Sequence, residues 1–589
     1  MYKRILAYLL FILVAVLIGS CSDVLSPANE NINELEDMYN DASYAEGILA
    51  NAYNLLPSNG WTFTDVATDN AVTNDNNAAL RQMATGQWTA DNYPLNQWQN
   101  SRAAIQYLNI FLANADQVQW ADDDATKELF NNRLKGEAYG LRALFTYHLL
   151  RNHSGWTGGN QSGELLGIPI ILEPQDKDSD FQTPRDTFEA SMEQIYSDIE
   201  SAGDLLPLDY GNVGSPGQLP DGFGSTNDDL GRFNRVFGDD GKQRMSGRIA
   251  LAVKAKAALL AASPAYTAGT TTSWEDAANY AGELLQLNGG ITGIAPEGDN
   301  WYNATDMASI GSGANPPEMI WRTNIGQSNA LESQHFPPTL FGNGRINPTQ
   351  SLVDAFPMAN GYPIDHPNSN YDPTNPYQNR VALLNEYILV NGGTAGVNST
   401  TIITAADGNT NDALNQVSTS TRTGYYMKKL LRQDVNLDPT STNNQLHYNP
   451  RIRYTEIYLA YAEAANEAWG PNGTGSFGFS AYDVIEAIRA RQGVDQPDQY
   501  MQNDITSTAD MRELIRSVRR IELAFENFRF WDLRRWNMDL TVPADGVSIV
   551  NGNFNRVTVE PREYQPYMQF GPIPFDEVLK FGLEQNYGW

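Results

Sequence analysis

The segment RRIELAFENFRFWDLRRW, residues 519–536, concentrates more chemically capable side chains than any other we considered. It holds five arginines, five aromatic residues and three acids. Guanidinium groups bind carboxylates and phosphates through paired hydrogen bonds and stack on aromatic rings, so the segment could bind an anion. The whole chain carries a formal net charge of −31, however, so these arginines could equally pair with internal acids. The first question is therefore whether they face a ligand or the interior.

The spacing of apolar residues in this segment favours the interior. Ile521, Phe525 and Phe528 continue the stripe of Leu514 and Val518 at steps of three and four, which predicts one buried helix face. The charged residues can then pair along the helix, with its neighbours, or in the turn that follows: Arg519, Glu522, Glu526, Arg529, Asp532 and Arg534. We therefore predict a scaffold role for the segment and expect folding to depend on Glu522 and Trp531.

A second segment has the chemistry of a sugar-binding loop. Residues 61–88, WTFTDVATDNAVTNDNNAALRQMATGQW, mix aromatic side chains with Asn, Asp, Gln and Arg. An aromatic ring suits the apolar C–H face of a sugar, and amide, carboxylate and guanidinium groups suit its hydroxyls. The simpler interpretation is a loop that its tryptophans anchor in the core.

Motifs of catalysis are missing. The five histidines, at positions 148, 153, 335, 366 and 447, show no metal-ligand spacing. The chain contains neither G-x-S-x-G nor H-E-x-x-H. GTGSFG at 473–478 follows a predicted helix rather than a strand, which argues against a dinucleotide site. We predict that the protein is not an enzyme and has neither catalytic residues nor a cofactor.

Two acidic loops space their oxygen ligands as calcium loops do. These are DKDSD at 176–180 and DVNLD at 434–438, although Pro439 stands where an EF-hand turn needs glycine. The sequence leaves a structural calcium ion open here, beside the simpler interpretation of solvated acidic loops.

The N-terminus indicates export and lipidation. Lys3 and Arg4 precede an apolar run from Ile5 to Ile18, which is short for a membrane span. Cys21 is the only cysteine, and the IGSC that it ends resembles the lipobox of bacterial lipoproteins, in which the thiol is alkylated by lipid. Several acyl chains give lasting membrane attachment. We predict a signal peptide over 1–20, a lipidated tether over 21–40 and a single body over 41–589.

Helical periodicity dominates the body. We expect helices over 98–117, 132–152, 183–207, 246–266, 273–287, 450–470, 481–493 and 509–533. Strand alternation is scarce, and only Ile168–Leu172 and Ile402–Ile403 suggest short strands. Small residues stand where paired helices would touch: Ala138, Ala143, Ala255, Ala258, Ala462 and Ala464. The predicted fold is mostly α, with stacked tetratricopeptide-like helix pairs supporting long irregular loops and few short strands.

Residues 288–450 differ in composition from the helical segments. They are rich in Asn, Gly, Thr and Pro and carry scattered aromatic residues. Irregular segments of this length are usually functional or partner-facing, so we expect ligand or partner contacts here. The acidic balance of the chain would repel a nucleic-acid backbone, which argues against DNA or RNA as partner.

Several motifs together resemble the SusD/RagB family of Bacteroidetes outer-membrane lipoproteins. They are GEAYGLRALFTYHLLR (136–151), NPTQSLVDAFPMANGYPI (347–364), YDPTNPYQNR (371–380), IRYTEIYLAYAEAANEA (452–468), the arginine-rich segment and the ending FGPIPFDEVLKFGLEQNYGW. Tyr587 stands where proline is usual in that ending. With the lipobox, the resemblance spans nearly the whole chain.

The resemblance implies a non-enzymatic, cell-surface protein of the outer membrane. Such a protein binds oligosaccharides, or peptides in some branches, and delivers them to a SusC-like TonB-dependent transporter, over which it acts as a lid. Alternatives that the residues leave open are a lipoprotein glycoside hydrolase and a helical adaptor that binds only proteins.

The resemblance also suggests ligand residues, in the loops near 65–84 and 327–346. They are Asp69, Asn70, Asn74, Asp75, Arg81, His335, Phe341 and Arg345. Trp88 and Trp98 resemble scaffold positions of the family, so we expect them in the core rather than at a ligand.

Overall fold

A computed structural model gives the fold of the chain. The structure describes residues 35–57, 62–298, 301–303, 307, 310 and 313–589. Cys21, the signal peptide and most of the predicted tether lie outside the described residues. Residues Leu35–Tyr39, which we expected in the tether, form a 3₁₀ helix whose Met38 is fully buried in the core. The folded body therefore begins at least six residues before position 41.

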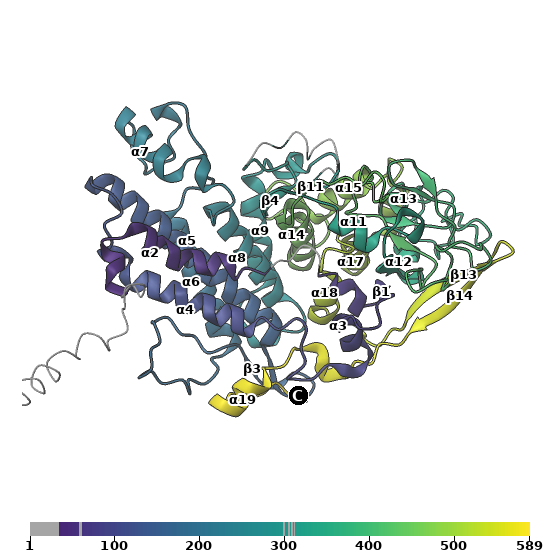
Figure 1. Cartoon of the computed structure of the whole chain (residues 1–589), viewed down its shortest axis with the longest axis horizontal. Coiled ribbons are helices and arrows are strands. Elements are labelled where there is room, and N and C mark those ends of the chain that lie inside the picture. The colour runs from purple at the N-terminus through teal and green to yellow at the C-terminus, as the bar shows by residue number, and fades with distance from the viewer. Residues whose placement is uncertain (1–34, 58–61, 299–300, 304–306, 308–309, 311–312) are drawn as a thin grey trace, which may run out of the picture.

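One half of the molecule is a stack of antiparallel helices, in which most helices pack on the ones before and after them (Figure 1). Their bounds are α2 Ala42–Asn54, α4 Trp98–Asn114, α5 Asp124–His153, α6 Phe188–Leu205, α7 Asn227–Phe237, α8 Gly247–Ala262 and α9 Trp274–Gln286. The alanines predicted at helix contacts are all buried. These helices confirm the predicted helical fold class.

A second group of helices continues the stack into the middle of the molecule (Figure 1). It comprises α14 Tyr454–Trp469, α15 Ala481–Arg491, α16 Gln499–Asp504, α17 Thr508–Glu522 and α18 Arg529–Arg535. Helix α14 packs on α8 and α9 on one side and on α15 and α17 on the other, so it joins the two halves. Its alanines and tyrosines are buried over the first thirteen residues, as a helix enclosed on all sides requires. None of the helices in the described ranges is long and apolar enough to cross a bilayer.

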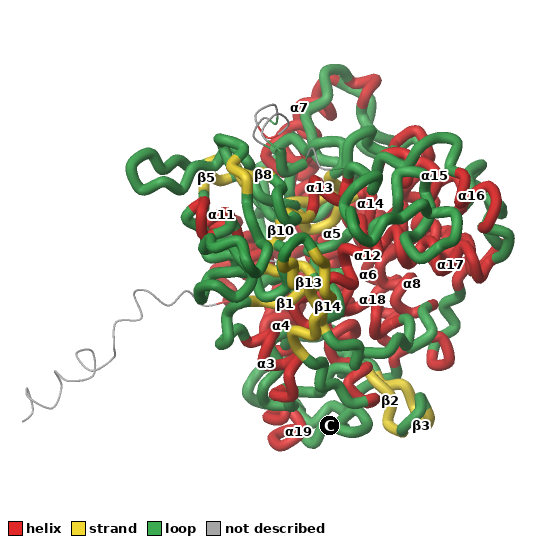
Figure 2. Tube along the Cα trace, turned by 90° about the vertical axis from the view of Figure 1, so that its right-hand side faces the viewer, coloured by secondary structure: helices red, strands yellow, loops and turns green. Residues whose placement is uncertain are grey.

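The other half is built from irregular segments and most of the short strand pairs (Figure 2). The pair formed by residues 155–158 and 162–166 lies apart from them, near the C-terminus (Figures 1 and 2). In the described part, every sheet has two antiparallel strands. The pairs are β1 Ala71–Thr73 with β6 Ile346–Pro348, β2 Gly155–Gly158 with β3 Ser162–Leu166, β4 Met319–Arg322 with β12 Pro450–Arg453, β5 Gly326–Ser328 with β11 Gln445–His447, β7 Ile388–Leu389 with β10 Tyr426–Met427, β8 Thr394–Ala395 with β9 Thr400–Thr401, and β13 Ala544–Val550 with β14 Asn553–Glu560.

Short helices complete this half and the C-terminus. They are α3 Ala79–Gln82, α11 Ala330–His335, α12 Gln350–Ala355, α13 Leu383–Tyr387 and α19 Phe575–Phe581. The β1–β6 pair joins the early segment 61–88 to the region that follows Phe341, so the two predicted ligand loops meet. The strands predicted at Ile168–Leu172 and Ile402–Ile403 are wrong, because both runs are irregular and flank β3 and β9 instead. Pro169 lacks the N–H that a ladder needs.

The long helix predicted over 509–533 is interrupted. Helix α17 ends at Glu522, and Phe525 and Asn527 adopt left-handed φ angles of 66° and 70°. The Lys429 Nζ donates hydrogen bonds to the carbonyl oxygens of Glu522 (2.8 Å) and Ala524 (3.1 Å). The buried Lys429 thus binds carbonyl oxygens that the next helical turn would otherwise have bound. The apolar stripe that we assigned to one helix is divided between α17 and the turn that follows it.

The last residue of α5, His153, gives a prediction for the pH dependence of stability. It is fully buried, and its Nδ1–H donates to the carbonyl oxygen of Pro572 (2.7 Å) while Nε2 accepts from the backbone N–H of Gln97 (3.3 Å). Burial lowers the pKa of His153 to about 4. Between pH 6.5 and 4 the unfolded chain therefore binds a proton that the folded chain does not, and stability falls as the pH falls.

We expect urea titrations to show a free energy of unfolding that decreases by up to about 3 kcal/mol from this residue across that window. The variant His153→Gln should have a shallower slope between pH 6.5 and 4, although it is less stable at pH 7. An equally steep slope in the variant would show that His153 does not carry this effect.

Candidate ligand-binding site

The arginine-rich segment, residues 519–536, faces the interior. Glu522 is 1% exposed and accepts hydrogen bonds from Arg491 (2.6 Å) and Gln492 (2.9 Å). Glu526 pairs with Lys429 (2.5 Å) and Arg453 (2.7 Å). Burial alone would raise the pKa of both carboxyl groups, but the adjacent cations lower it. The predicted scaffold role is thus consistent with the geometry, and these charges need no external ligand.

Further along the segment, other arginines also have internal partners. Asp532 accepts from Arg519 (2.8 Å) and Arg535 (2.9 Å), and Arg535 binds Glu463 (2.5 and 2.7 Å). The Arg534 guanidinium lies 3.5 Å from the ring centroid of Phe530. Stacked and bidentate arginine contacts of this kind hold α18 against α14 and the C-terminal segment.

Two of the predicted ligand residues, Asp69 and Asn70, belong to the same internal network. Asp69 receives two hydrogen bonds from Arg529 (2.8 and 2.7 Å) and an ion pair from Arg520 (3.1 Å). Burial opposes ionisation of Asp69, yet the two guanidinium groups hold its pKa well below the usual range. Asn70 is fully buried and binds Asp65 through its amide N–H (2.9 Å). Because their polar atoms are occupied internally, we leave both out of the ligand contacts proposed below.

Four other predicted residues, of which Phe341 is exposed and the rest half-buried, form an area that we call the loop surface: Asn74, Asp75, Phe341 and Arg345. The Asn74 amide donates to the carbonyl oxygens of Asn343 (2.9 Å) and Gly344 (3.0 Å), and its Oδ1 accepts from Arg345 (3.1 Å). Arg345 lies 3.9 Å from Asp75. Phe341 is 57% exposed, in a left-handed backbone conformation that turns the loop. The loop surface therefore offers one aromatic ring beside amide, carboxylate and guanidinium groups.

The remaining two predicted residues lie elsewhere. Arg81 pairs with Glu560 (2.6 Å) and binds Asn76. His335 is 6% exposed and packs edge-on against the ring of Phe63, with 4.7 Å between ring centroids. Burial, with a smaller contribution from Arg345, lowers the pKa of His335 to about 3, so it is neutral at physiological pH. These contacts describe packing, and a ligand role for either residue stays a prediction.

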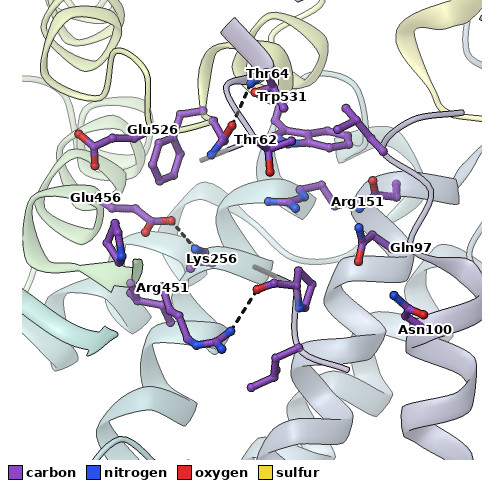
Figure 3. A pocket seen from close by; sticks show the side chains of 18 of the residues that line it. Thr62, Thr64, Gln97, Asn100, Arg151, Lys256, Arg451, Glu456, Glu526 and Trp531 are labelled. Carbon is purple, nitrogen blue, oxygen red and sulfur yellow. Dashed lines mark hydrogen bonds and ion pairs between the residues drawn. The ribbon is translucent and has the colours of Figure 1, made fainter. Parts of the chain in front are cut away.

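A pocket that we did not predict lies where the two halves of the molecule meet. This central pocket has a volume of about 470 Å³, within the range of about 300–1,000 Å³ typical of small-molecule sites. Its walls come from the end of α2, the starts of α4 and α14, the end of α5, the middle of α8 and the turn before α18 (Figure 3). Six segments distant in sequence therefore converge on it.

Polar side chains surround the pocket. Lys256 and Glu456 form an ion pair in its wall (2.6 Å), and Arg451 donates to the carbonyl oxygen of Pro57 (3.1 Å). Amide and hydroxyl side chains add further donors and acceptors: Asn54, Thr62, Gln97, Asn100, Asn152 and Asn527. This mixture of paired charges and amides can satisfy a ligand that carries many hydroxyl groups.

Two aromatic rings, those of Phe528 and Trp531, line the pocket. Unlike Trp88 and Trp98, which are buried as predicted, Trp531 is only partly buried. The Arg151 guanidinium lies 4.5 Å from its ring centroid, and both side chains lie at the pocket in Figure 3. Part of the Trp531 surface therefore remains open to a ligand, and the expectation that folding depends on Trp531 stays a prediction.

Little in the sequence indicated this pocket. Arg151 and Trp531 both lie inside motifs that we assigned to the scaffold, and neither motif shows which of its side chains is left exposed. The turn before α18 exposes Trp531 because Phe525 and Asn527 break the helix, and their φ angles are not apparent from hydrophobic spacing. Only tertiary structure brings the ends of α2 and α5 to that turn.

The acidic loops have local partners. Asp178 pairs with Lys177 (2.6 Å), and Asp434 pairs with Arg432 (2.7 Å). Among the residues that the structure describes, no group of three or more His, Cys, Asp or Glu side chains could hold a metal ion. One carboxylate of each loop is thus paired with a neighbouring cation.

Comparisons with known proteins identify similar sequences and folds. Residues 317–589 match the family model described as the SusD family, and residues 28–216 match a second model, "starch-binding associating with outer membrane". Among proteins with curated descriptions, none matches this sequence.

Solved structures share the fold over nearly the full length. A SusD-like protein from Bacteroides fragilis is 21% identical, with a TM-score of 0.71 over 96% of this chain and 100% of its own. A SusD-like carbohydrate-binding protein from the same species is 20% identical, with a TM-score of 0.66 over 92% and 98%. The surface glycan-binding protein A of Bacteroides fluxus is 17% identical, with a TM-score of 0.56 over 93% and 99%.

Proposed function

This chain belongs to the SusD/RagB family, and from that premise we propose that it is a cell-surface lipoprotein that binds oligosaccharides and delivers them to a SusC-like TonB-dependent transporter. Two structural relatives support the ligand class, because one is described as a carbohydrate-binding protein and the other as a surface glycan-binding protein. The protein binds its ligand without chemistry and needs no cofactor.

The central pocket is the observation that carries this proposal. A sugar ring stacks its C–H face on Trp531, and the amides around it bind the hydroxyls. A pocket whose ion pairs are already formed does not need to reorganise when the ligand enters, which limits the loss of entropy on binding. The polar lining also requires a ligand with many hydrogen-bonding groups, because an apolar ligand would leave those groups without water.

Isothermal titration calorimetry with a panel of oligosaccharides and a panel of short peptides tests the ligand class. We expect at least one oligosaccharide to bind, with no release of reducing ends during prolonged incubation. Binding of peptides alone would favour the peptide-binding branch of the family, and release of reducing ends would favour a hydrolase.

The transporter and the membrane anchor form the second part of the proposal. The second family model describes proteins associating with the outer membrane, and the lipobox ending at Cys21 supplies the anchor. Affinity purification from detergent-solubilised outer membranes is expected to recover a barrel protein together with this chain. Recovery of the chain alone, under conditions that keep other outer-membrane complexes intact, would contradict the pairing.

The loop surface supplies a second, shallower contact for longer ligands. We expect Phe341→Ala to weaken the binding of long oligosaccharides by about three- to tenfold, because one exposed stacking platform is lost, and to leave mono- and disaccharide binding unchanged. Calorimetry with a length series measures this difference. The control is Phe575→Ala, which removes a similarly exposed ring from α19. An equal effect of Phe341→Ala on short ligands would contradict a separate loop contact.

A further inference from the structure

Arg151, in the wall of the central pocket, differs from most buried arginines of this protein. Those have carboxylate partners, such as Arg142 with Asp198 (2.6 Å) and Arg489 with Asp498 (2.6 Å). Several others, such as Arg185 and Arg380, donate to backbone carbonyl oxygens. Within the described part of the chain, no carboxylate or carbonyl oxygen pairs with Arg151, so its charge lacks the usual compensation.

The contacts that Arg151 does have fix its position. Its guanidinium lies 4.5 Å from the ring centroid of Trp531 and 5.5 Å from that of Tyr147, and one Nη lies 3.4 Å from His148 Nδ1. Burial and the nearby cations hold the pKa of His148 well below its ordinary value, so His148 is neutral and adds no charge. The C-terminal end of α5 contributes only a partial negative charge.

The Nε atom of Arg151 is buried and has no hydrogen-bond partner among the described residues. This atom has almost no accessible surface, so a ligand in the pocket cannot reach it. The two Nη groups form the end of the guanidinium, which can bind a carboxylate through two parallel hydrogen bonds, and Arg151 lines the pocket. The charge of Arg151, which has no internal carboxylate partner, therefore fits a carboxylate of the ligand.

The other charges of the pocket do not supply this partner. Glu456 is paired with Lys256 (2.6 Å), and Glu526 with Lys429 (2.5 Å) and Arg453 (2.7 Å). Arg451, the second cation without an ion pair in the described pocket wall, donates to Pro57 (3.1 Å). The pocket is thus locally positive inside a chain of net charge −31. At physiological ionic strength charges beyond about 8 Å are largely screened, so the local cations determine the preference.

We propose that the central pocket recognises an acidic sugar unit, whose carboxylate binds the Nη groups of Arg151 while its ring stacks on Trp531. The inference rests on the proposed function for the presence of a sugar, and it adds the charge of that sugar. A uronate or sialate residue carries both a ring and a carboxylate and therefore satisfies the two requirements together. Neutral starch-like glycans lack the carboxylate and leave Arg151 unpaired.

The test uses oligosaccharides that contain uronate or sialate units, each compared by calorimetry with its carboxyl methyl ester. The members of each pair differ in charge and hardly in shape. We expect the acid to bind at least about tenfold more tightly than the ester, because charge-assisted hydrogen bonds replace neutral ones. Sulfated oligosaccharides form a third arm, and tight binding of sulfated sugars alone would overturn the assignment of a carboxylate.

Variants of the full chain locate the effect. Arg151→Gln should reduce the ratio of acid to ester affinity to near one. Arg556→Gln, which removes an exposed cation on β14, should keep the wild-type ratio. A wild-type ratio near one, or a ratio that Arg151→Gln does not change, would overturn the inference.

The two proposals fail in different ways. If neutral sugars and esters bind as well as acids and Trp531→Ala abolishes that binding, the glycan function holds and the acidic preference is wrong. If no oligosaccharide of any charge binds, both proposals are wrong.

Discussion

Glu522→Ala is expected to lower the free energy of unfolding by about 3–5 kcal/mol, the usual cost of removing one partner from a buried ion pair. The carboxylate of Glu522 binds Arg491 (2.6 Å) and Gln492 (2.9 Å), and the Arg453 guanidinium lies 3.9 Å away. Without it, buried cations at the end of α17 lose their compensation. Urea denaturation of purified protein measures the change, and a lower folding yield should accompany it.

The matched control is Glu513→Ala, on the exposed side of the same helix. Glu513 is paired with Arg516 (3.0 Å) at the surface, where such pairs contribute about 0–1 kcal/mol. Stability losses of equal size in the two variants would show that the internal network around Glu522 is not what holds α17 in place.

Trp531→Ala is expected to weaken oligosaccharide binding by about 10- to 100-fold, which corresponds to about 1.4–2.7 kcal/mol. The indole ring lies in the wall of the central pocket, with the Arg151 guanidinium 4.5 Å from its centroid. The loss should be larger than that of Phe341→Ala for short ligands, since only the pocket encloses a single sugar unit. Calorimetry at several ligand lengths measures both effects.

Trp531 also contacts Phe530, so its removal affects packing as well as binding. Trp531→Phe separates the two effects, because it keeps an aromatic platform in the pocket. We expect Trp531→Phe to retain most of the affinity and Trp531→Ala to lose it at temperatures where both variants are folded by circular dichroism. Equal affinities of wild type and Trp531→Ala for short ligands would exclude this ring as the platform.

Hydrophobic spacing predicted most of the helical fold, because most helices bury a regular stripe. It failed where a charge ended a helix: Lys429 binds the carbonyl oxygens that follow α17, and no local pattern around Glu522 shows a partner 93 residues away. It also failed at Leu35–Tyr39, where a single buried residue, Met38, holds a polar segment onto the core.

The candidate site was harder to predict than the fold. Acidic and amide residues such as Asp69 and Asn70 suggested ligand contacts from their types, but Arg520 and Arg529 occupy them from far along the chain. Conversely, Arg151 and Trp531 looked like scaffold, since the motifs around them are regular and apolar. Whether a polar side chain faces a ligand depends on which distant groups satisfy it, and local sequence does not specify those groups.

A crystal structure of the protein with the tightest-binding oligosaccharide of the panel tests the central claim most directly. The account predicts density for a sugar ring over Trp531 in the central pocket, with a hydrogen-bonding group of the ligand at the Nη groups of Arg151. An oligosaccharide bound only over Phe341 and the loop surface, with the central pocket unchanged, would contradict it.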